Sequence, residues 1–109
     1  MKDLPESDWK LLRLMKDTLL RRASRTALEQ VKGVVIGPDD DPYKVYLALW
    51  DTLKSEDGKI SRMFDNMKRS TAILKLAEMI RNELIREDEL QGFTEETRER
   101  AKEIASQVL

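Results

Sequence analysis

An apolar stripe with helical spacing runs through the first third of the chain, and it constrains the fold more than any other feature. At about 100° per residue its members fall on one broad face, and charged residues occupy the opposite face. The stripe consists of Trp9, Leu12, Met15, Leu19, Leu20, Ala23, Ala27, Val31 and Val34. It starts after Pro5 and is stopped by Gly37 and Pro38. The pattern predicts one helix of roughly 30 residues, about 45 Å long.

Turn and capping residues predict several further helices. Asp41 followed by Pro42 is typical of an N-cap with proline in the first turn, so we expect a second helix to begin there. Its apolar face, which we expect to be core or interface, consists of Tyr43, Tyr46, Leu47, Trp50 and Leu53. The segment 55–58 reads Ser-Glu-Asp-Gly and predicts an interruption. A third helix would then place on one face the residues Ile60, Met63, Phe64 and Met67.

The apolar pattern changes phase beyond Ser70, which predicts either a kink or a new helix capped by Ser70. We expect Asn82 to end that helix in a left-handed conformation, and Thr94 to cap a last helix. No stretch alternates with period two for long enough to predict a strand. The sequence therefore predicts a single all-α domain over residues 1–109. Its expected form is a compact bundle of four to six helices, with a long N-terminal helix and a C-terminal helical hairpin.

Charge is distributed unevenly along the chain, although the net charge is only −1. Residues 9–32 carry seven Lys or Arg against two Asp or Glu, and residues 83–103 carry eight Asp or Glu against four Lys or Arg. Opposite charges favour docking of these two regions. We expect them to face each other, within one chain or across a dimer.

Catalytic groups are scarce, because the 109 residues contain no histidine and no cysteine. This excludes Ser-His-Asp and Cys-His catalysis and cysteinyl metal sites, and no glycine-rich phosphate loop occurs. The glutamates at 95, 99 and 103 share one helical face, which we interpret as a solvated face. We expect no enzyme, no catalytic, cofactor-binding or metal-binding residues, and no membrane partner. Without a signal peptide or a membrane-length apolar run, the expected location is the cytoplasm.

Two short segments resemble small uncharacterised bacterial proteins. They are residues 4–10, Leu-Pro-Glu-Ser-Asp-Trp-Lys, and residues 64–70, Phe-Asp-Asn-Met-Lys-Arg-Ser. That all-helical family has no assigned activity, so the resemblance implies a bacterial origin and no chemistry. The stretch 76–93 is similar to a short helical hairpin found in many bacterial proteins.

Surplus apolar residues on the first helix support the first functional hypothesis. Leu11, Leu14 and Leu28 lie outside its main stripe, toward the charged side, and with Trp9 they form a candidate self-association surface. This favours a non-enzymatic protein–protein interaction module, an adaptor or regulator that forms a homodimer.

The alternative hypothesis is a nucleic-acid-associated regulator. Arg21 and Arg25 on the first helix, with Lys68 and Arg69 further along, form a candidate patch for neutralising phosphates. Acidic residues interrupt the basic stripe and the net charge is slightly negative, so this hypothesis ranks second. Neither hypothesis names a particular partner or pathway.

Overall fold

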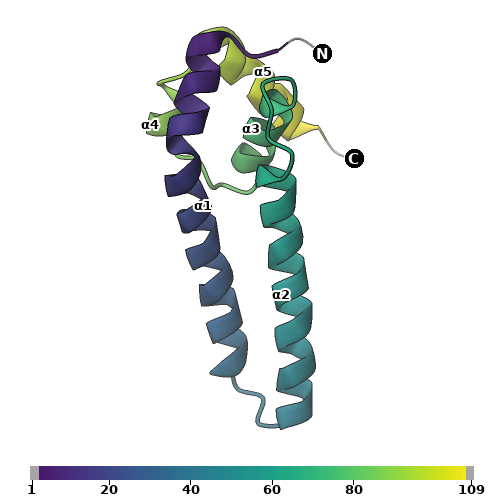
Figure 1. Ribbon diagram of the computed structural model, residues 1–109. Helices are drawn as coiled ribbons and strands as arrows, with labels where there is room; N and C mark the ends of the chain where they lie inside the picture. The colour runs from purple at the N-terminus through teal and green to yellow at the C-terminus, as the bar shows by residue number, and fades with distance from the viewer. Residues whose placement is uncertain (1–2, 108–109) are drawn as a thin grey trace.

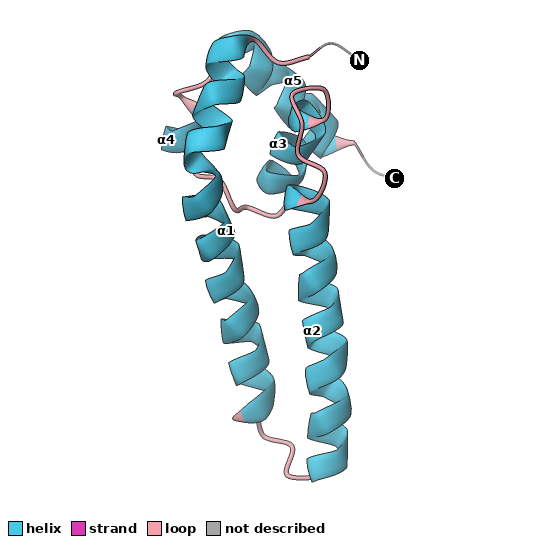
Figure 2. Ribbon diagram, in the orientation of Figure 1, coloured by secondary structure: helices cyan, strands magenta, loops and turns pink. Residues whose placement is uncertain are grey.

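The computed structural model describes residues 3–107, which form five helices and no strand (Figures 1 and 2). These helices are α1 (Glu6–Val35), α2 (Pro42–Phe64), α3 (Ala72–Arg81), α4 (Glu87–Leu90) and α5 (Glu95–Ser106). The predicted all-α fold with a long first helix is confirmed. So is the N-cap of α2, because the Asp41 side chain accepts a hydrogen bond from the Tyr43 backbone N–H at 3.0 Å.

Helices α1 and α2 run side by side as a long hairpin, and α3, α4 and α5 pack at one end of it (Figure 1). We call this end, with the adjoining turns of α1 and α2, the head. The molecule measures 52 × 28 × 23 Å. Its radius of gyration is 16.2 Å, above the roughly 13 Å typical of a globular domain of about 100 residues. The extra length is the part of the hairpin that extends beyond the head.

The hydrophobic core lies in the head. Its buried members come from the segment before α1, from α1 as far as Ala23, from the last turn of α2, from α3 and α5, and from α4 with its flanking segments. They are Leu4, Leu12, Leu19, Ala23, Met63, Phe64, Ala72, Ile73, Leu76, Met79, Leu84, Ile85, Leu90, Phe93 and Ala101. Beyond Ala23 the core ends, and the rest of the hairpin consists of α1 and α2 alone.

Helix α2 continues through the segment where an interruption was predicted. Residues 55–58 are helical, and the expected second and third helices are one helix of 23 residues. Glu56 is only 8% exposed, which shows that this segment packs against the rest of the chain. A single Gly58 costs a helix only about 1 kcal/mol, and packing overrides such a cost. The apparent change of phase arose because α2 is apolar on two different faces.

The change of phase after Ser70 marks a new helix, because residues 65–71 are not helical and α3 begins at Ala72. Ser70 does not cap α3, since the N-cap position is Thr71. The Thr71 hydroxyl folds back into the turn, where it donates to the Asn66 carbonyl at 2.8 Å and accepts from the Lys68 N–H at 3.0 Å.

The prediction of a left-handed Asn82 was wrong by one residue. Asn82 has φ −90° and Glu83 has φ 55°. The Leu84 N–H donates to the Met79 carbonyl at 2.8 Å, which places Glu83 at the left-handed position of a Schellman motif. Asn82 is instead the last residue before the turn, and its side-chain amide donates to the Glu78 carbonyl at 2.8 Å.

A buried carboxylate joins the first and last helices. Asp8 in α1 is 1% exposed and accepts hydrogen bonds from the Thr94 N–H, the Thr94 hydroxyl and the Thr97 hydroxyl, at 2.9, 2.7 and 2.6 Å. Thr94 also caps α5 as predicted, because its hydroxyl accepts from the Thr97 N–H at 3.4 Å. Asp8 thereby takes the place of the acidic side chain that normally completes a capping box from within the same helix.

Candidate interaction surface

The outward side of α2 exposes a continuous apolar stripe. Its members recur three or four residues apart, so they share one side of the helix. We call this stripe the outer face of α2. It consists of Tyr43, Tyr46, Leu47, Trp50 and Leu53, exposed by 67, 56, 43, 50 and 42%. The expectation that these residues belong to the chain's own core is therefore wrong. The expectation that they belong to an interface stays a prediction.

The outer face points away from α1. The covered side of α2 is formed by Val45, Leu49 and Thr52, which are half-buried, and by the buried Glu56. At 100° per residue this side lies about 120° around the helix from the outer face. Helix α1 contacts α2 along the hairpin. The other helices pack in the head, at the C-terminal end of α2. No described element therefore covers the outer face.

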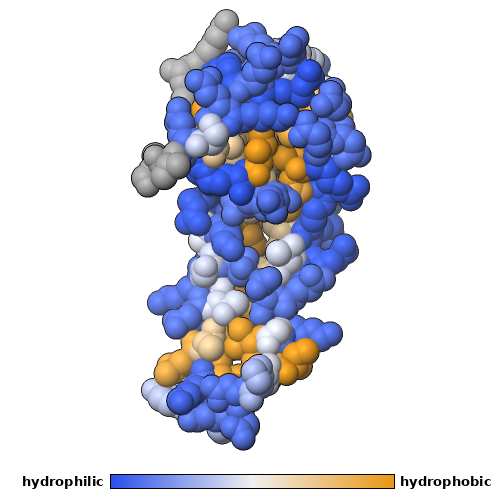
Figure 3. All heavy atoms as spheres, turned by 180° about the vertical axis from the view of Figure 1, so that it is seen from behind, coloured by the Kyte–Doolittle hydropathy of each residue, from blue (hydrophilic) through white to orange (hydrophobic). Residues whose placement is uncertain are grey.

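The end of the hairpin adds further exposed apolar side chains. Val35 and Ile36, where α1 ends, are 55 and 71% exposed. In Figure 3, apolar residues gather at this end of the molecule, below a more hydrophilic middle section. A second apolar area in that view opens toward the core in the head. We call the part of the hairpin beyond the head the far hairpin, and it exposes apolar side chains both on the outer face of α2 and at the end of α1.

The residues of the sequence-based self-association surface do not come together. Trp9 and Leu11 are half-buried and pack against the core of the head, and the Arg13 guanidinium lies 5.8 Å from the Trp9 ring centroid. Leu14 and Leu28 are 80 and 68% exposed. They are four turns apart on α1, about 21 Å by its rise per residue. The exposed pair therefore lacks the continuity of the outer face of α2.

The candidate nucleic-acid patch is likewise divided. Arg21 forms an exposed ion pair with Asp17 at 2.9 Å, and Arg25 lies one turn further along α1. Arg69 is held near the start of α1, where its Nε donates to the Leu4 carbonyl at 2.8 Å. About 28 Å of helix therefore separates Arg69, which lies beside Glu6, from Arg25. Lys68, the residue before Arg69, is exposed in the turn ahead of α3.

The contact between the basic first helix and the acidic C-terminal region is confirmed within the chain. The Arg22 guanidinium donates to both carboxylate oxygens of Glu89, at 2.7 and 3.0 Å, and to the Leu84 carbonyl at 2.9 Å. The Arg86 N–H also donates to Glu89. The hydrogen bond from Arg22, supported by that from Arg86, lowers the pKa of Glu89 to about 2. This half-buried fork attaches α4 to α1.

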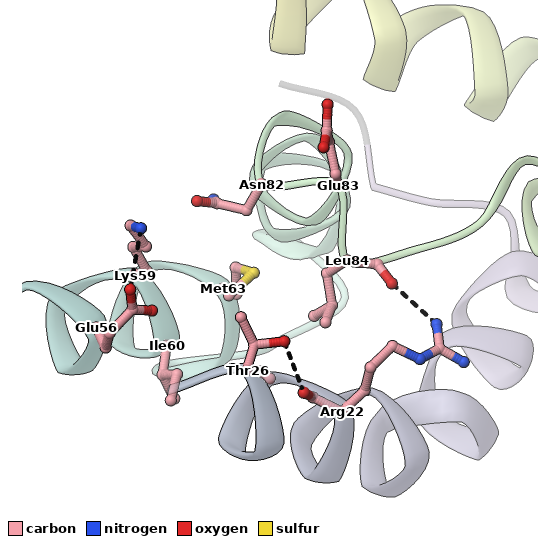
Figure 4. Close-up of a pocket in the computed structure, with 10 residues that line it drawn as sticks. Arg22, Thr26, Glu56, Lys59, Ile60, Met63, Asn82, Glu83 and Leu84 are labelled. Carbon is pink, nitrogen blue, oxygen red and sulfur yellow. Dashed lines mark hydrogen bonds and ion pairs between the residues drawn. The ribbon is translucent and has the colours of Figure 1, made fainter. Parts of the chain in front are cut away.

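A cavity of about 120 Å³ lies beside that fork, between α1, α2 and the end of α3 (Figure 4). Glu56 and Lys59 line it and pair with each other at 3.3 Å, and Met63 and Leu84 give it an apolar side. Ligand pockets commonly occupy about 300–1,000 Å³. A cavity this small, lined by groups already bonded to one another, suits one or two water molecules better than a substrate.

A more open groove of about 400 Å³ lies between α3, the end of α2 and α5. Two of the three basic side chains that line it hold the fold together: Lys75 donates to the Arg62 carbonyl, and Arg81 donates to the carbonyls of Ile104 and Ala105. Since Lys75 and Arg81 already have partners, this groove has fewer charged groups available to bind a ligand than its volume suggests. The outer face of α2 is the more distinctive surface.

Comparisons with protein-family models, with curated proteins and with solved structures found no match. This result agrees with the resemblance to a helical family that has no assigned activity. Over residues 3–107, no cluster of three or more acidic side chains is arranged to hold a metal ion. None of the described helices combines the length and apolar character needed to cross a membrane.

Proposed function

We propose that this chain is a non-enzymatic protein–protein interaction module that associates through the outer face of α2. The observation that carries the proposal is the set of three large aromatic side chains, Tyr43, Tyr46 and Trp50, each at least half exposed on one face. Tyr and Trp are enriched in the centres of protein interfaces, where they supply large contact areas with few rotatable bonds. Single exposed leucines are ordinary, but a continuous stripe of this kind is not.

The rest of the chain supports the same reading. The sequence has neither histidine nor cysteine. Arg22 and Glu89, which form a charged pair with two hydrogen bonds, bind each other and join α1 to α4. The buried carboxylate of Asp8 accepts hydrogen bonds from Thr94 and Thr97, and so joins α1 to α5. The most extensive exposed apolar and aromatic surface that remains is the outer face of α2, and it suits binding to another protein.

Site-specific photocrosslinking in cells of the native host tests the proposal. A benzophenone amino acid replaces Leu47 on the outer face, and a matched variant carries it at Glu29, an exposed position on α1. We expect the Leu47 variant to form covalent adducts with protein and the Glu29 variant to form few or none. Equal labelling at both positions, or none at either, would contradict the proposal.

The same experiment distinguishes protein binding from the nucleic-acid alternative. An adduct whose mass falls after nuclease treatment would favour it. The patch of Arg21, Arg25, Lys68 and Arg69 would then become the surface to mutate.

A further inference from the structure

We infer that the occupant of the outer face of α2 is a second copy of this chain, with the two α2 helices antiparallel about a two-fold axis near Ala48. The inference rests on the proposed function and specifies its partner. A two-fold dimer requires a surface that is complementary to itself. The outer face meets this requirement in both its apolar pattern and its charges.

The large apolar residues of the outer face are arranged nearly symmetrically along α2 on either side of Ala48. With the two-fold axis near Ala48, Tyr43 lies opposite Leu53 of the second copy, and Tyr46 lies opposite Trp50 of the second copy. Leu47 lies close to its own counterpart. Each aromatic side chain therefore meets a large apolar one, and aromatic pairs add about 0.5–1.5 kcal/mol beyond the area they bury.

The charges beside the stripe select the antiparallel arrangement. Lys44 and Asp51 lie on the same edge of the outer face, about 20° apart around the helix. Both are exposed, and neither has a side-chain hydrogen bond or ion pair within the described residues. About the same two-fold axis, Lys44 lies opposite Asp51 of the second copy, and this pair occurs twice. A parallel two-fold pairing would instead place this edge of the two helices on opposite sides of the interface, where Lys44 does not meet Asp51 of the second copy.

The available area fits a reversible dimer. Aromatic side chains bury roughly 150–250 Å² each, so the exposed fractions of Tyr43, Tyr46 and Trp50 offer roughly 250–450 Å² per chain. Leu47, Leu53 and the charged edge extend this toward the roughly 800 Å² per partner of a standard interface. Pairing would also give the far hairpin a second layer of helices, which it lacks in the single chain.

Sedimentation velocity of the purified full chain, from roughly 1 μM to roughly 300 μM, tests the inference. We expect the native chain to dimerise with rising concentration. Trp50→Glu should keep it monomeric over this range, because it places a charge in the centre of the interface. Circular dichroism should show unchanged helix content, since Trp50 is half exposed and lies off the covered side of α2. A native chain that stays monomeric throughout would overturn the inference.

Charge reversal tests the arrangement itself. Lys44→Asp and Asp51→Lys should each weaken dimerisation by about tenfold, because each turns two attractive pairs into repulsive ones. The combined variant should recover the native association, because both pairs re-form with their signs exchanged. Lys16→Asp, at an exposed position on α1, is the matched control and should have little effect. A combined variant as weak as the single ones would overturn the antiparallel arrangement.

These outcomes separate the inference from the proposed function. If the chain is monomeric in vitro but Leu47 crosslinks to a different protein in cells, the interaction module stands and the homodimer is refuted. If the chain dimerises but the variants of α2 leave the dimer unaffected, another surface forms it and the inference is equally refuted. Adducts of twice the chain's mass from Leu47, together with rescue by the combined variant, support both.

Discussion

Removing the carboxylate of Asp8 should strongly destabilise the protein. Asp8→Ala leaves three donors without their acceptor: the Thr94 N–H, the Thr94 hydroxyl and the Thr97 hydroxyl. Thr97 is 1% exposed, so water cannot readily replace the lost oxygen there. Asp8→Asn is the matched variant. It keeps one acceptor oxygen and the shape of the side chain, and its amide donates to hydroxyls that rotate to accept.

The size of the effect follows from the three bonds and the desolvation of the charge. Hydrogen bonds to a charged group contribute about 1.5–3 kcal/mol each, and burying the carboxylate costs several kcal/mol in return. The net loss for Asp8→Ala is about 3 kcal/mol, which changes the unfolding equilibrium by roughly two orders of magnitude. For Asp8→Asn we expect a loss of about 1–2 kcal/mol.

Urea unfolding followed by tryptophan fluorescence and circular dichroism measures these losses. With a slope of about 1–3 kcal/mol per molar urea, Asp8→Ala should lower the midpoint by roughly 1–3 M. All variants need the same protein concentration, because self-association would add concentration-dependent stability. A loss below about 1 kcal/mol for Asp8→Ala, or equal losses for both variants, would refute the reasoning. The carboxylate would then not hold α1 to α5.

Three further predictions concern the Arg22–Glu89 fork, Gly33 and Gly92. Because the pKa of Glu89 falls from 4.5 to about 2 on folding, its ionised form stabilises the protein above pH 4.5. That contribution, up to about 3 kcal/mol, is lost as the pH falls toward 2, and Glu89→Gln should flatten the pH dependence of urea unfolding there. Gly33→Ala should stabilise by about 0.5–1 kcal/mol, since nothing lies within 4 Å of the added methyl group. Gly92→Ala should cost about 1–2 kcal/mol, because its methyl would lie 2.9 Å from Leu11 Cδ2.

The predictions for Glu89 and Gly92 each have a control. Glu87→Gln changes an exposed carboxylate paired with Lys102, and it should leave most of the acid sensitivity intact. An equally flat pH profile in that variant would contradict the role given to Glu89. For the glycines, Leu11→Ala in the Gly92→Ala background should remove the strain. If Gly92→Ala alone unfolds like the native chain, Leu11 does not pack against that turn.

Local signals account for what the sequence predicted correctly. The length of α1, the Asp41 cap and the Thr94 cap depend on residues within one or two turns of each other, and all three are confirmed. The contact of the basic first helix with the acidic region was also foreseen, because the charge imbalance is large. The choice of Arg22 and Glu89 as partners was not, since it depends on the path of the chain between them.

Two failures share one cause, which is that a single helix can be apolar on two faces. In α2, Tyr43 to Leu53 follow one face and Ile60 and Met63 follow another. Because the change of apolar face was interpreted as a break, the single helix α2 was predicted as two helices. The same reading left open whether the aromatic face belongs to the core. Periodicity shows that a face is apolar, but only the position of neighbouring elements shows whether it is covered.

The role of Asp8 was missed for a different reason. In sequence it is an acidic residue in the first turn of a helix, where the helix dipole alone explains it. Its partners, Thr94 and Thr97, are 86 and 89 residues away, at the cap and in the first turn of α5. The one local sign is that Thr97 stands where a capping box would carry Glu or Gln. A helix cap that lacks its acidic residue is a reason to look for a buried carboxylate elsewhere in the chain.

The placement of large and small side chains along the far hairpin is an argument for a partner in its own right. Between α1 and α2 the seam contains small or medium residues, among them Ala27, Val31, Val45 and Leu49, while the aromatic side chains face outward. A hairpin that had to be stable alone would gain more by the reverse arrangement, because an aromatic side chain buries more apolar area than Ala or Val. The small residues of the seam let the two helices approach closely. The aromatic side chains lie instead on a face of α2 that no other described part of the chain covers. Tyr43, Tyr46 and Trp50 would therefore gain buried apolar area only through an association, and in the proposed dimer each of them gains an apolar neighbour.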